Sequence, residues 1–594
     1  MGEARDETMG REIAHGKRLK SLMLGVAAFA ASGALAGLAI HGAPHAAPAP
    51  AAASGACNKD IGITLPPGFC ATIFADDLGN TRHIVVAADG TVYANTWNGS
   101  SYFRGTKPDP AGFLIALQDT NHDGKADKVS RFGLTAAEGS KGGTGIGLYK
   151  NAVYAEMNDE IVRYPLAKGA DVPMGKPEVV VSGMPLGGDH PMHPFAINAK
   201  GQMFIDMGTA TNSCQPKNRQ PGIPGAEPCV EKETRGGTWL YSADTLDQKF
   251  SPAERYITGL RNGMGLSFDS SGRLYATQHG RDQLIQNWGK LYPDVKQTVE
   301  LPSEELVLET KGADFGWPNC YYDNFQKKLV LAPEYGGDGG KAVGVCAQKT
   351  APVAAFPAHW APNDMTIYNA KAFPAAYHGG AFIAFHGSWN RSPAVQDGFN
   401  VVFQPLKDGK ASGNYIVFAD GFAGPNKASG KAIFRPTGVA VGPDGALYIS
   451  EDTKGRIWKV TYQGAAGAPL QSAPQPTYET QAPAAGAGET ASLLVPDGAT
   501  AAQVAHGQAV FKGGSCGACH GADAAGGPVG PPLNTGSPIW TDGSLGSIKT
   551  LIAKGVPAPK QYRSPMPPEG GAQLSDDDLN AVAAYVWAVG HAKK

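Results

Sequence analysis

Three residues near the end of the chain have the types and the spacing that attach a haem group. Cys516, Cys519 and His520 form the pattern C-x-x-C-H. Two thiols at this spacing can both add to the vinyl groups of one haem, and the adjacent histidine then lies under the iron as its ligand. The alternatives are a redox C-x-x-C and half of a zinc site, and zinc is disfavoured because no second cysteine pair lies nearby. The sequence therefore predicts one covalently bound haem c.

The second axial ligand of this haem is predicted to be Met566. It is the only methionine of the last hundred residues, and prolines on both sides restrict its loop. His506 and His591 are the alternatives, but His506 fits a solvated helix position and His591 lies at the end of the chain. Residues 495–594 resemble class I cytochromes c. His/Met ligation raises the haem potential, which suits an electron acceptor.

A second group of ligand-type residues lies in one short segment. Asp119, Asn121, Asp123 and Asp127 occupy positions 1, 3, 5 and 9, with glycine at position 6. Oxygen ligands at this spacing wrap one calcium ion, with the Lys125 carbonyl at position 7. Serine stands at position 12, where an EF-hand has a glutamate, and strands are expected on both sides. We therefore expect a structural calcium loop, with an Asx-rich turn as the alternative.

The elements that would position these residues are short strands in recurring hairpins. A turn followed by a strand with aromatic or aliphatic residues occurs six times, with the alternation typical of strands. Such repetition predicts a mainly β fold, a six-bladed β-propeller with one four-stranded blade per repeat. A pair of β-sandwiches and an eight-bladed propeller are the alternatives. The segments are 89–94, 151–155, 201–205, 272–276, 380–384 and 445–449.

The chain divides into four predicted segments. Residues 1–56 contain a basic flank, an apolar stretch and an Ala/Pro tract, which is the order of an export signal, although the stretch is long enough to remain as a membrane anchor. The propeller is expected over 57–462, an Ala/Pro/Gly linker over 463–494 and a small all-α cytochrome c domain over 495–594. Helices are expected over 501–511 and 574–590, the second with an N-terminal signal at Ser575.

The other six cysteines and the charge agree with an exported protein. An even number of cysteines outside the cytoplasm favours disulfides, although six cysteines allow 15 connectivities. The net charge of −2, without a basic run beyond the N-terminus, argues against a nucleic-acid partner. The longest interval between repeats predicts an insertion around Cys320 and Cys346. The couples nearest in sequence are Cys57 with Cys70, Cys214 with Cys229 and Cys320 with Cys346.

The middle of the chain also carries a constellation of motifs. They are Gly188-Asp189-His190, Gly259 to Gly265, Gln278-His279-Gly280-Arg281-Asp282, His386 to Arg391 and Arg435 to Gly438. Together they resemble the soluble-glucose-dehydrogenase and sorbosone-dehydrogenase group of quinoproteins, over about residues 64–462 and closest to the sorbosone-dehydrogenase branch. The resemblance implies a six-bladed propeller that binds pyrroloquinoline quinone (PQQ).

The resemblance also implies the roles of individual residues. His190, with Asp189 beside it, matches the catalytic base, and Arg261 matches the arginine that polarises the quinone. A histidine suits a general base near neutral pH, and arginines suit the three carboxylates of PQQ. The alternative for His190 is a structural bond to a turn. The residues expected to contact PQQ are Arg82, Asn262, Gln278, Arg391 and Arg435.

The chain departs from this family at one loop. There a Gly-Pro loop binds the calcium ion that bridges to PQQ, whereas this sequence reads His279-Gly280-Arg281. This departure puts the bridging calcium in doubt. The expectation is that Arg281 or His279 replaces part of its charge.

These features predict a periplasmic quinohaemoprotein. It would oxidise a sugar or sugar aldehyde with PQQ and pass electrons to its haem, from which another cytochrome or a terminal oxidase accepts them. The alternative, motivated by the altered calcium loop, is an electron-transfer cytochrome with a non-catalytic propeller that serves as a docking module. A propeller hydrolase acting on lactones is a third possibility, but it leaves the haem without a role.

Overall fold

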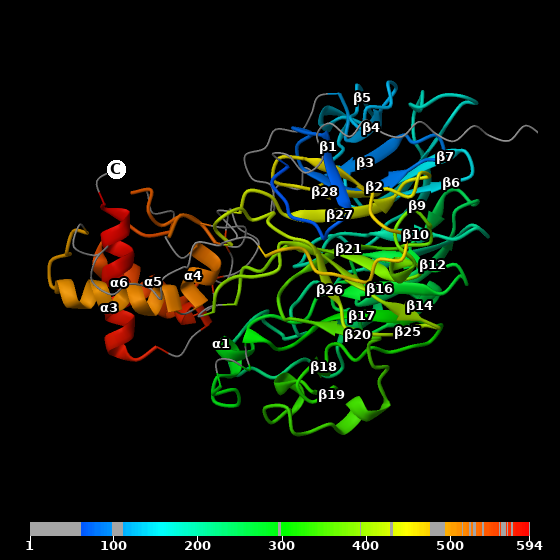
Figure 1. The fold of residues 1–594 in the computed structure, drawn as a ribbon. Coiled ribbons are helices and arrows are strands. Elements are labelled where there is room, and N and C mark those ends of the chain that lie inside the picture. Colours follow the sequence, from blue (N-terminus) through cyan, green and yellow to red (C-terminus); the bar gives the residue numbers. More distant parts are fainter. Residues whose placement is uncertain are drawn as a thin grey trace, which may run out of the picture. The chain divides into compact units, whose positions relative to one another are not determined.

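The structure is a computed structural model in which a strand-rich part is followed by a helical part (Figure 1). The predicted export segment 1–56 and Cys57 lie outside the residues that it describes. The described residues are 61–97, 111–294, 297, 299–391, 394–427, 432–475, 493–513, 515–521, 524–526, 530–536, 540–556, 559, 566, 568–571 and 574–592.

The strand-rich part consists of six antiparallel blades of four strands each, and β13 (Gln248–Lys249) adds a parallel fifth strand to the second blade. Blade 1 consists of β2 (Thr81–Val86), β3 (Val92–Thr96), β4 (Leu114–Gln118) and β5 (Lys128–Phe132). Blade 2 consists of β6 (Ile146–Tyr149), β7 (Ala152–Met157), β8 (Glu160–Pro165) and β9 (Glu178–Ser182). Blade 3 consists of β10 (Phe195–Ile197), β11 (Gln202–Met207), β12 (Gly237–Ser242) and β14 (Arg255–Thr258). Blade 4 consists of β15 (Leu266–Phe268), β16 (Leu274–Gln278), β17 (Glu304–Glu309) and β20 (Ala354–Phe356). Blade 5 consists of β21 (Pro362–Ile367), β22 (Ala381–Phe385), β23 (Asn400–Gln404) and β26 (Ile416–Ala419). Blade 6 consists of β27 (Pro436–Val441), β28 (Leu447–Glu451), β29 (Ile457–Tyr462) and β1 (Phe69–Ala75).

The blades close into a ring, which confirms the predicted six-bladed propeller. The first strands of successive blades contact one another in the cyclic order β2, β6, β10, β15, β21, β27 and back to β2. The N-terminal strand β1 completes the last blade by pairing with β29, with Phe69 opposite Tyr462. The two ends of the propeller sequence are thus joined in one sheet, which closes the ring.

Each of the six recurring sequence segments forms the second strand of a blade and the turn before it. Their aromatic side chains are almost fully buried, as in Tyr93, Tyr154, Tyr275 and Phe382. These rings pack against residues of the neighbouring blade. Tyr93 and Val153, for example, belong to one apolar cluster shared by blades 1 and 2. The aromatic side chain that recurs at this position therefore packs each blade against its neighbour.

Polar side chains near the end of most second strands bind the next blade. Glu156 accepts hydrogen bonds from the backbone N–H of Thr144 and Gly145 and, at 2.8 Å, from His193 at the entry to blade 3. Asp206 likewise accepts from Gly263 N–H at 3.2 Å in the approach to blade 4. These bonds fix the entry of the next first strand, where the candidate site residues lie.

Two buried acids at the boundary of blades 3 and 4 carry oxygen atoms without partners. Asp206 and Glu309 are 1 % and 3 % exposed, and Asp206 Oδ1 and Glu309 Oε2 have no hydrogen-bond partner within the described part of the chain. The hydroxyl of Thr238 donates to the other oxygen of Glu309 at 2.8 Å. Burial raises the pKa of Glu309 to about 8, and burial together with Glu309 raises the pKa of Asp206.

We expect this raised pKa to make the propeller less stable as pH rises. Folded Glu309 keeps its proton up to about pH 8, whereas the unfolded residue loses it near 4.5, so stability is complete below 4.5 and falls between these values. In E309Q the free energy of unfolding should fall less steeply, by about 1.4 kcal/mol per pH unit. Urea unfolding of the propeller from pH 5 to 8 measures this, with E254Q at an exposed position as the control. Equal slopes for wild type and E309Q would contradict the prediction.

A disulfide-linked insertion interrupts blade 4. Between β17 and β20 the chain forms β18 (Cys320–Asp323) and β19 (Lys328–Leu331), and a disulfide joins Cys320 to Cys346. A second disulfide joins Cys214 to Cys229. Both predicted pairs are confirmed, while the pairing of Cys70 with Cys57 stays a prediction. The remaining short elements of the propeller are β24 (Leu406–Lys407), β25 (Lys410–Ala411) and α1 (Leu284–Trp288).

The helical part forms its own core. Helices α3 and α6 pack where Gly507 lies so close to Ala581 that an added Cβ would be 1.8 Å from its carbonyl oxygen. The side chain of Ser575 accepts from Asp578 N–H and caps α6, as its sequence predicts. The helices are α3 (Ala501–Gly513), α4 (Ser515–His520), α5 (Leu545–Lys554) and α6 (Asp576–Gly590).

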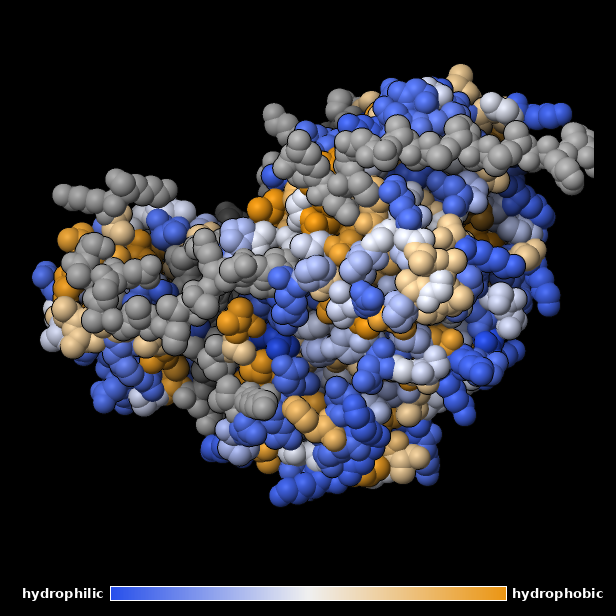
Figure 2. Space-filling model, in the orientation of Figure 1, coloured by the Kyte–Doolittle hydropathy of each residue, from blue (hydrophilic) through white to orange (hydrophobic). Residues whose placement is uncertain are grey.

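The surface seen in Figure 2 is mostly hydrophilic, with hydrophobic residues in small groups. No helix among the residues that the structure describes is both long and apolar enough to cross a membrane.

Candidate functional site

The propeller residues singled out by the sequence lie on connections at one face of the ring. In an antiparallel blade, the entry to the first strand and the connection from the second to the third strand lie at the same edge. We call the face formed by these edges the site face. Arg82 begins a first strand, and His190, Arg261 and Arg435 precede first strands; Gln278 ends a second strand, and Arg391 follows one. The predicted calcium loop joins the third and fourth strands, β4 and β5, so it lies on the opposite face.

His190 is held as a neutral base. Its Nδ1 lies 2.8 Å from the carbonyl oxygen of Thr209, which can only accept, so Nδ1 carries the proton and Nε2 carries the lone pair. His190 is 8 % exposed, and Nε2 has no hydrogen-bond partner among the described residues. Burial, followed by the charges of Arg261 and Arg219, lowers its pKa well below 6.5. The alternative for His190 was a structural bond to a turn. That bond is present between Nδ1 and the Thr209 carbonyl oxygen, and it leaves Nε2 available.

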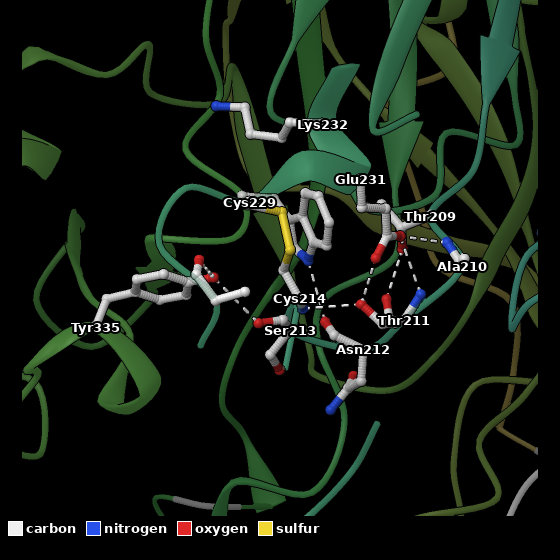
Figure 3. The surroundings of a disulfide bond; sticks show 12 residues. Thr209, Ala210, Thr211, Asn212, Ser213, Cys214, Cys229, Glu231, Lys232 and Tyr335 are labelled. Carbon is white, nitrogen blue, oxygen red and sulfur yellow. Dashed lines mark hydrogen bonds between the residues drawn. A yellow bond between two sulfur atoms is a disulfide. The ribbon is translucent and has the colours of Figure 1, made fainter. Parts of the chain in front are cut away.

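A hydrogen-bonded segment holds Thr209 in place (Figure 3). The carboxylate of Glu231 accepts from the N–H groups of Ala210 and Thr211 and, at 2.7 Å, from the Thr211 hydroxyl. The Cys214–Cys229 disulfide lies beside these bonds and links the chain just after Thr211 to the chain just before Glu231. The sequence did not point to Glu231. The groups that donate to it lie 20 and 21 residues away along the chain, and no local motif marks them.

Asp282 forms the centre of the buried charges. Its Oδ2 lies 2.8 Å from Arg261 Nη2 and 3.0 Å from Arg219 Nη2, and its Oδ1 accepts from Asn390 Nδ2 at 2.6 Å. Burial would raise the pKa of Asp282, but Arg261 and Arg219 hold it far below its ordinary value. The sequence missed Arg219. Asp189 Oδ2 lies 2.9 Å from Arg219 Nη2, so Asp189 pairs with this arginine and not with His190.

A second buried cluster joins blades 1, 5 and 6. Asp452 lies 2.6 Å from Arg82 Nη1 and 2.9 Å from His386 Nε2. Arg435 donates to the carbonyl oxygens of His386 and Gly387 at 3.0 and 2.8 Å. Burial and the nearby Arg435 lower the pKa of His386 to about 4, so this histidine is neutral. Two arginines then face one carboxylate, which leaves a surplus positive charge.

The other predicted PQQ contacts have partners within the protein. Gln278 accepts the backbone N–H of Arg261 at 3.0 Å and so positions it. Arg391 lies 2.6 Å from Glu300 and donates to the Ala358 carbonyl oxygen at 2.8 Å, so it braces the loop before blade 5. Its contact with PQQ stays a prediction. Asn262 is buried, and its Oδ1 has no partner.

The two side chains of the altered loop, His279 and Arg281, have partners within the protein. Burial and Arg261 lower the pKa of His279 to about 3, so it is neutral, and its Nε2 donates to the Pro362 carbonyl oxygen at 3.0 Å. Arg281 lies 2.8 Å from Glu334 of the insertion, a carboxylate that is fully covered. Arg281 Nη2 is buried without a hydrogen-bond partner among the described residues, and the expectation that Arg281 or His279 replaces part of the calcium charge stays a prediction.

In the predicted calcium loop, the oxygen ligands accept hydrogen bonds from the loop backbone. Asp119 accepts from the N–H of Asp123 and Gly124, and Asp127 accepts from Thr120 and Asn121. This is the pattern of the Asx-rich turn, and no cluster of three or more His, Cys, Asp or Glu in the described chain is arranged around a metal ion. Calcium at this loop stays a prediction.

The residues of the haem motif fit a covalent haem. Cys516 and Cys519 lie on α4 and are free thiols. His520 is 7 % exposed, and its Nδ1 lies 2.8 Å from the carbonyl oxygen of Pro531. Because that carbonyl can only accept, Nδ1 is protonated and Nε2 is left for an iron ion, as in metal-binding histidines generally.

The position of Met566 is consistent with a second ligand. Its N–H and carbonyl pair with Val556 at 3.0 and 2.7 Å, and its side chain packs against the helical core. The two histidine alternatives are engaged elsewhere. His506 bonds Asp578 at 2.7 Å, and His591 stacks on Trp587 with 4.0 Å between the ring centroids. Met566 remains the predicted ligand.

Comparison with known proteins matches both parts of the chain. The TrAA12-like family model matches residues 63–463, and a cytochrome c family model matches residues 504–590. A pyrroloquinoline quinone-dependent pyranose dehydrogenase of Coprinopsis cinerea is 26 % identical over 229 residues, 34 % of this chain and 30 % of that protein. An uncharacterised Borreliella burgdorferi protein is 27 % identical over 231 residues, 37 % of this chain and 52 % of that protein. The chain therefore spans about half or less of these relatives' length.

The cytochrome part and the solved structures add two further likenesses. The cbb3-type cytochrome c oxidase subunit FixP of Rhizobium etli is 36 % identical over 89 residues, 14 % of this chain and 30 % of that protein. Iodide and calcium structures of a Trichoderma reesei carbohydrate-active enzyme of family AA12 align with TM-scores of 0.52, at 17 % and 18 % identity. They cover 68 % of this chain and 98 % and 97 % of those chains, and at this identity they show a shared fold.

Proposed function

The chain belongs to the TrAA12-like family and continues into a cytochrome c domain, and we propose that it is a quinohaemoprotein dehydrogenase that oxidises a sugar or sugar aldehyde. The observation that carries this proposal is His190, a neutral base with a free Nε2, next to the buried Arg261 and Arg219. Family membership supports an oxidoreductase, and the site supports removal of a proton from a hydroxyl group.

The charges of the site fit PQQ. The cofactor carries three carboxylates, and the two clusters contain three buried arginines, Arg82, Arg219 and Arg261, together with the partly buried Arg435. Arg261 Nε and Asn262 Oδ1 are buried without hydrogen-bond partners, and such atoms are costly unless a ligand engages them. We expect Arg82, Arg261 and Arg435 to bind the cofactor, with Asn262 beside Arg261.

The residues of the chain divide the chemistry between them. Bound PQQ would supply the two-electron oxidant and haem c the one-electron carrier. His190 Nε2 would accept the proton of the substrate hydroxyl, and Thr209 would hold the ring in the tautomer that makes this possible. Arg261 would stabilise negative charge that develops opposite the base. His520 and Met566 would hold the haem iron.

We place the protein in the periplasm, with electrons leaving to another cytochrome or a terminal oxidase. Covalent haem and two disulfides support an exported protein. The likeness of the C-terminal part to an oxidase subunit supports an electron-transfer partner of this kind.

Reconstitution tests the function. The purified haem-loaded chain is titrated with PQQ and calcium, and a panel of aldoses and sorbosone is added while the haem absorption band is recorded. We expect haem reduction that depends on both PQQ and substrate. A Cys516→Ala, Cys519→Ala variant, which cannot attach haem, should still reduce an added dye. PQQ that binds without any substrate reducing haem or dye would favour the non-catalytic docking module.

A further inference from the structure

Residues 463–475, which the sequence assigns to the linker, lie against the propeller, and we call them the strap. Gln463 N–H donates to the Gly68 carbonyl oxygen at 2.8 Å, just before β1. Farther along, Ala473 N–H donates to the Val417 carbonyl oxygen of β26 at 2.8 Å, and the Thr64 hydroxyl donates to Pro474 at 2.8 Å. Ala473 is 4 % exposed. The chain is therefore bound to blade 5 after it leaves blade 6.

The strap carries the chain from one face of the propeller to the other. Strand β29 is a third strand, so it ends at Tyr462 on the face opposite the site. Thr64, which bonds the end of the strap, pairs with Asp420, where the connection from blade 5 to blade 6 leaves β26. That connection belongs to the site face. The strap thus ends beside the site face, and the yellow to orange trace of Figure 1 can be followed past β26.

The position of this end sets where the cytochrome c domain is tethered. Only residues 476–492 separate the strap from Leu493, which packs against the helical core. Seventeen residues can span at most about 56–61 Å even when fully extended. This upper limit keeps the domain within reach of the site face.

The site face also presents apolar side chains that could contact a partner. Scattered exposed apolar residues are ordinary, but six large ones lie on the connections of this face, and a docking surface combines such residues with a polar rim. They are Leu186, Ile223, Val230, Leu291, Val395 and Ile433, each more than a third exposed.

We propose that the site face is the docking surface of the chain's own cytochrome c domain, and that the strap delivers the tether to it. The inference rests on the proposed function, because docking there brings the haem to the cofactor site. It specifies which face of the propeller the cytochrome c domain contacts, which neither the haem motif nor the family match indicates. If the chain were released at Tyr462, the tether would start on the far side of the propeller.

Spin labels test the docking without PQQ. Leu186→Cys places a nitroxide on the site face, and Met174→Cys, in the connection between β8 and β9, places one on the opposite face; both residues are exposed. Ferric haem is paramagnetic and speeds relaxation of a nearby nitroxide. In the haem-loaded full chain we expect severalfold greater enhancement at Leu186→Cys than at Met174→Cys. Equal enhancement, or a larger one at Met174→Cys, overturns the proposal.

A matched pair of strap variants tests the tether. Ala473→Asp buries a charge against β26 and should release the strap, whereas Ser472→Asp adds the same charge at an exposed neighbour. Release lengthens the free chain and moves its origin, so we expect the enhancement at Leu186→Cys to fall at least about twofold in Ala473→Asp and not in Ser472→Asp. An unchanged signal after release, shown by new protease cleavage in the strap, contradicts the role of the strap.

Dye reduction distinguishes failure of the docking proposal from failure of the proposed dehydrogenase function. If substrate reduces a dye through PQQ but the relaxation difference is absent, the dehydrogenase stands and the docking fails. If the relaxation difference is present but neither dye nor haem is reduced, the docking stands and the dehydrogenase fails.

Discussion

Replacing His190 with alanine should lower the rate of PQQ-dependent haem reduction by substrate about 10²–10⁴-fold, the usual contribution of a general base. The imidazole combines a nitrogen lone pair that no described residue engages with a tautomer fixed by the Thr209 carbonyl oxygen. PQQ binding should persist, because the arginines of the site are untouched. Stopped-flow measurement of the haem band at saturating substrate gives the rate, and PQQ titration gives the affinity.

The pH profile distinguishes a base from a merely structural histidine. Since burial and the arginines lower the pKa of His190, the base is already deprotonated at neutral pH. The wild-type kcat/KM should therefore stay level as pH falls through 6.5 and decline only in more acidic solution. His378→Ala, an exposed histidine between β21 and β22 on the opposite face, is the control and should keep the wild-type rate. A His190→Ala variant within threefold of wild type at neutral pH would refute the assignment.

Asp282→Asn should cost about 3–5 kcal/mol of unfolding free energy at pH 7, because it leaves two buried guanidinium groups without their shared carboxylate. Arg261 and Arg219 both lie within 3.0 Å of Asp282 Oδ2. The pKa of Asp282 is depressed in the folded protein, so its contribution is present above the ordinary pKa of 3.8 and is lost as pH falls. Urea unfolding of the propeller at pH 7 measures the loss.

A second ion pair provides the control for this substitution. Asp444 lies 2.9 Å from Lys459 and is about half exposed, so Asp444→Asn should cost less than about 1 kcal/mol. Adding Arg261→Met to Asp282→Asn should recover part of the loss, since one unpaired charge disappears while Arg219 keeps its ion pair with Asp189. Similar losses of unfolding free energy in Asp282→Asn and Asp444→Asn would contradict the prediction that Asp282 stabilises the two buried arginines.

Several features could be predicted from the sequence because they depend on neighbouring residues. The haem motif is contained in the five residues from Cys516 to His520. The six hairpins repeat a turn followed by a strand with aromatic or aliphatic residues, and each became an almost fully buried second strand. Ser575 caps its helix through a bond to a residue three positions away. The disulfides Cys214–Cys229 and Cys320–Cys346 also join residues that are near in sequence.

The candidate site itself was predicted only in part. His190 and Arg261 could be named from their motifs, and they lie on the same face within one network of charges. Arg219 was missed, because it lies in an irregular loop without a motif. Arg391 was expected to face a cofactor, yet its charge pairs with Glu300, which lies far away in the sequence. A motif identifies a residue type, but it does not tell which buried partner takes its charge.

The sequence by itself determined the haem attachment at Cys516, Cys519 and His520 and the repeating blades, since both follow from local spacing. Only the tertiary structure decided the protonation of His190, the sharing of Asp282 and the path of the strap. Burial and the partners that folding brings together set the charge state of a side chain. The direction of a tether likewise depends on which blade edge it binds. Closure of the ring brings these distant residues together.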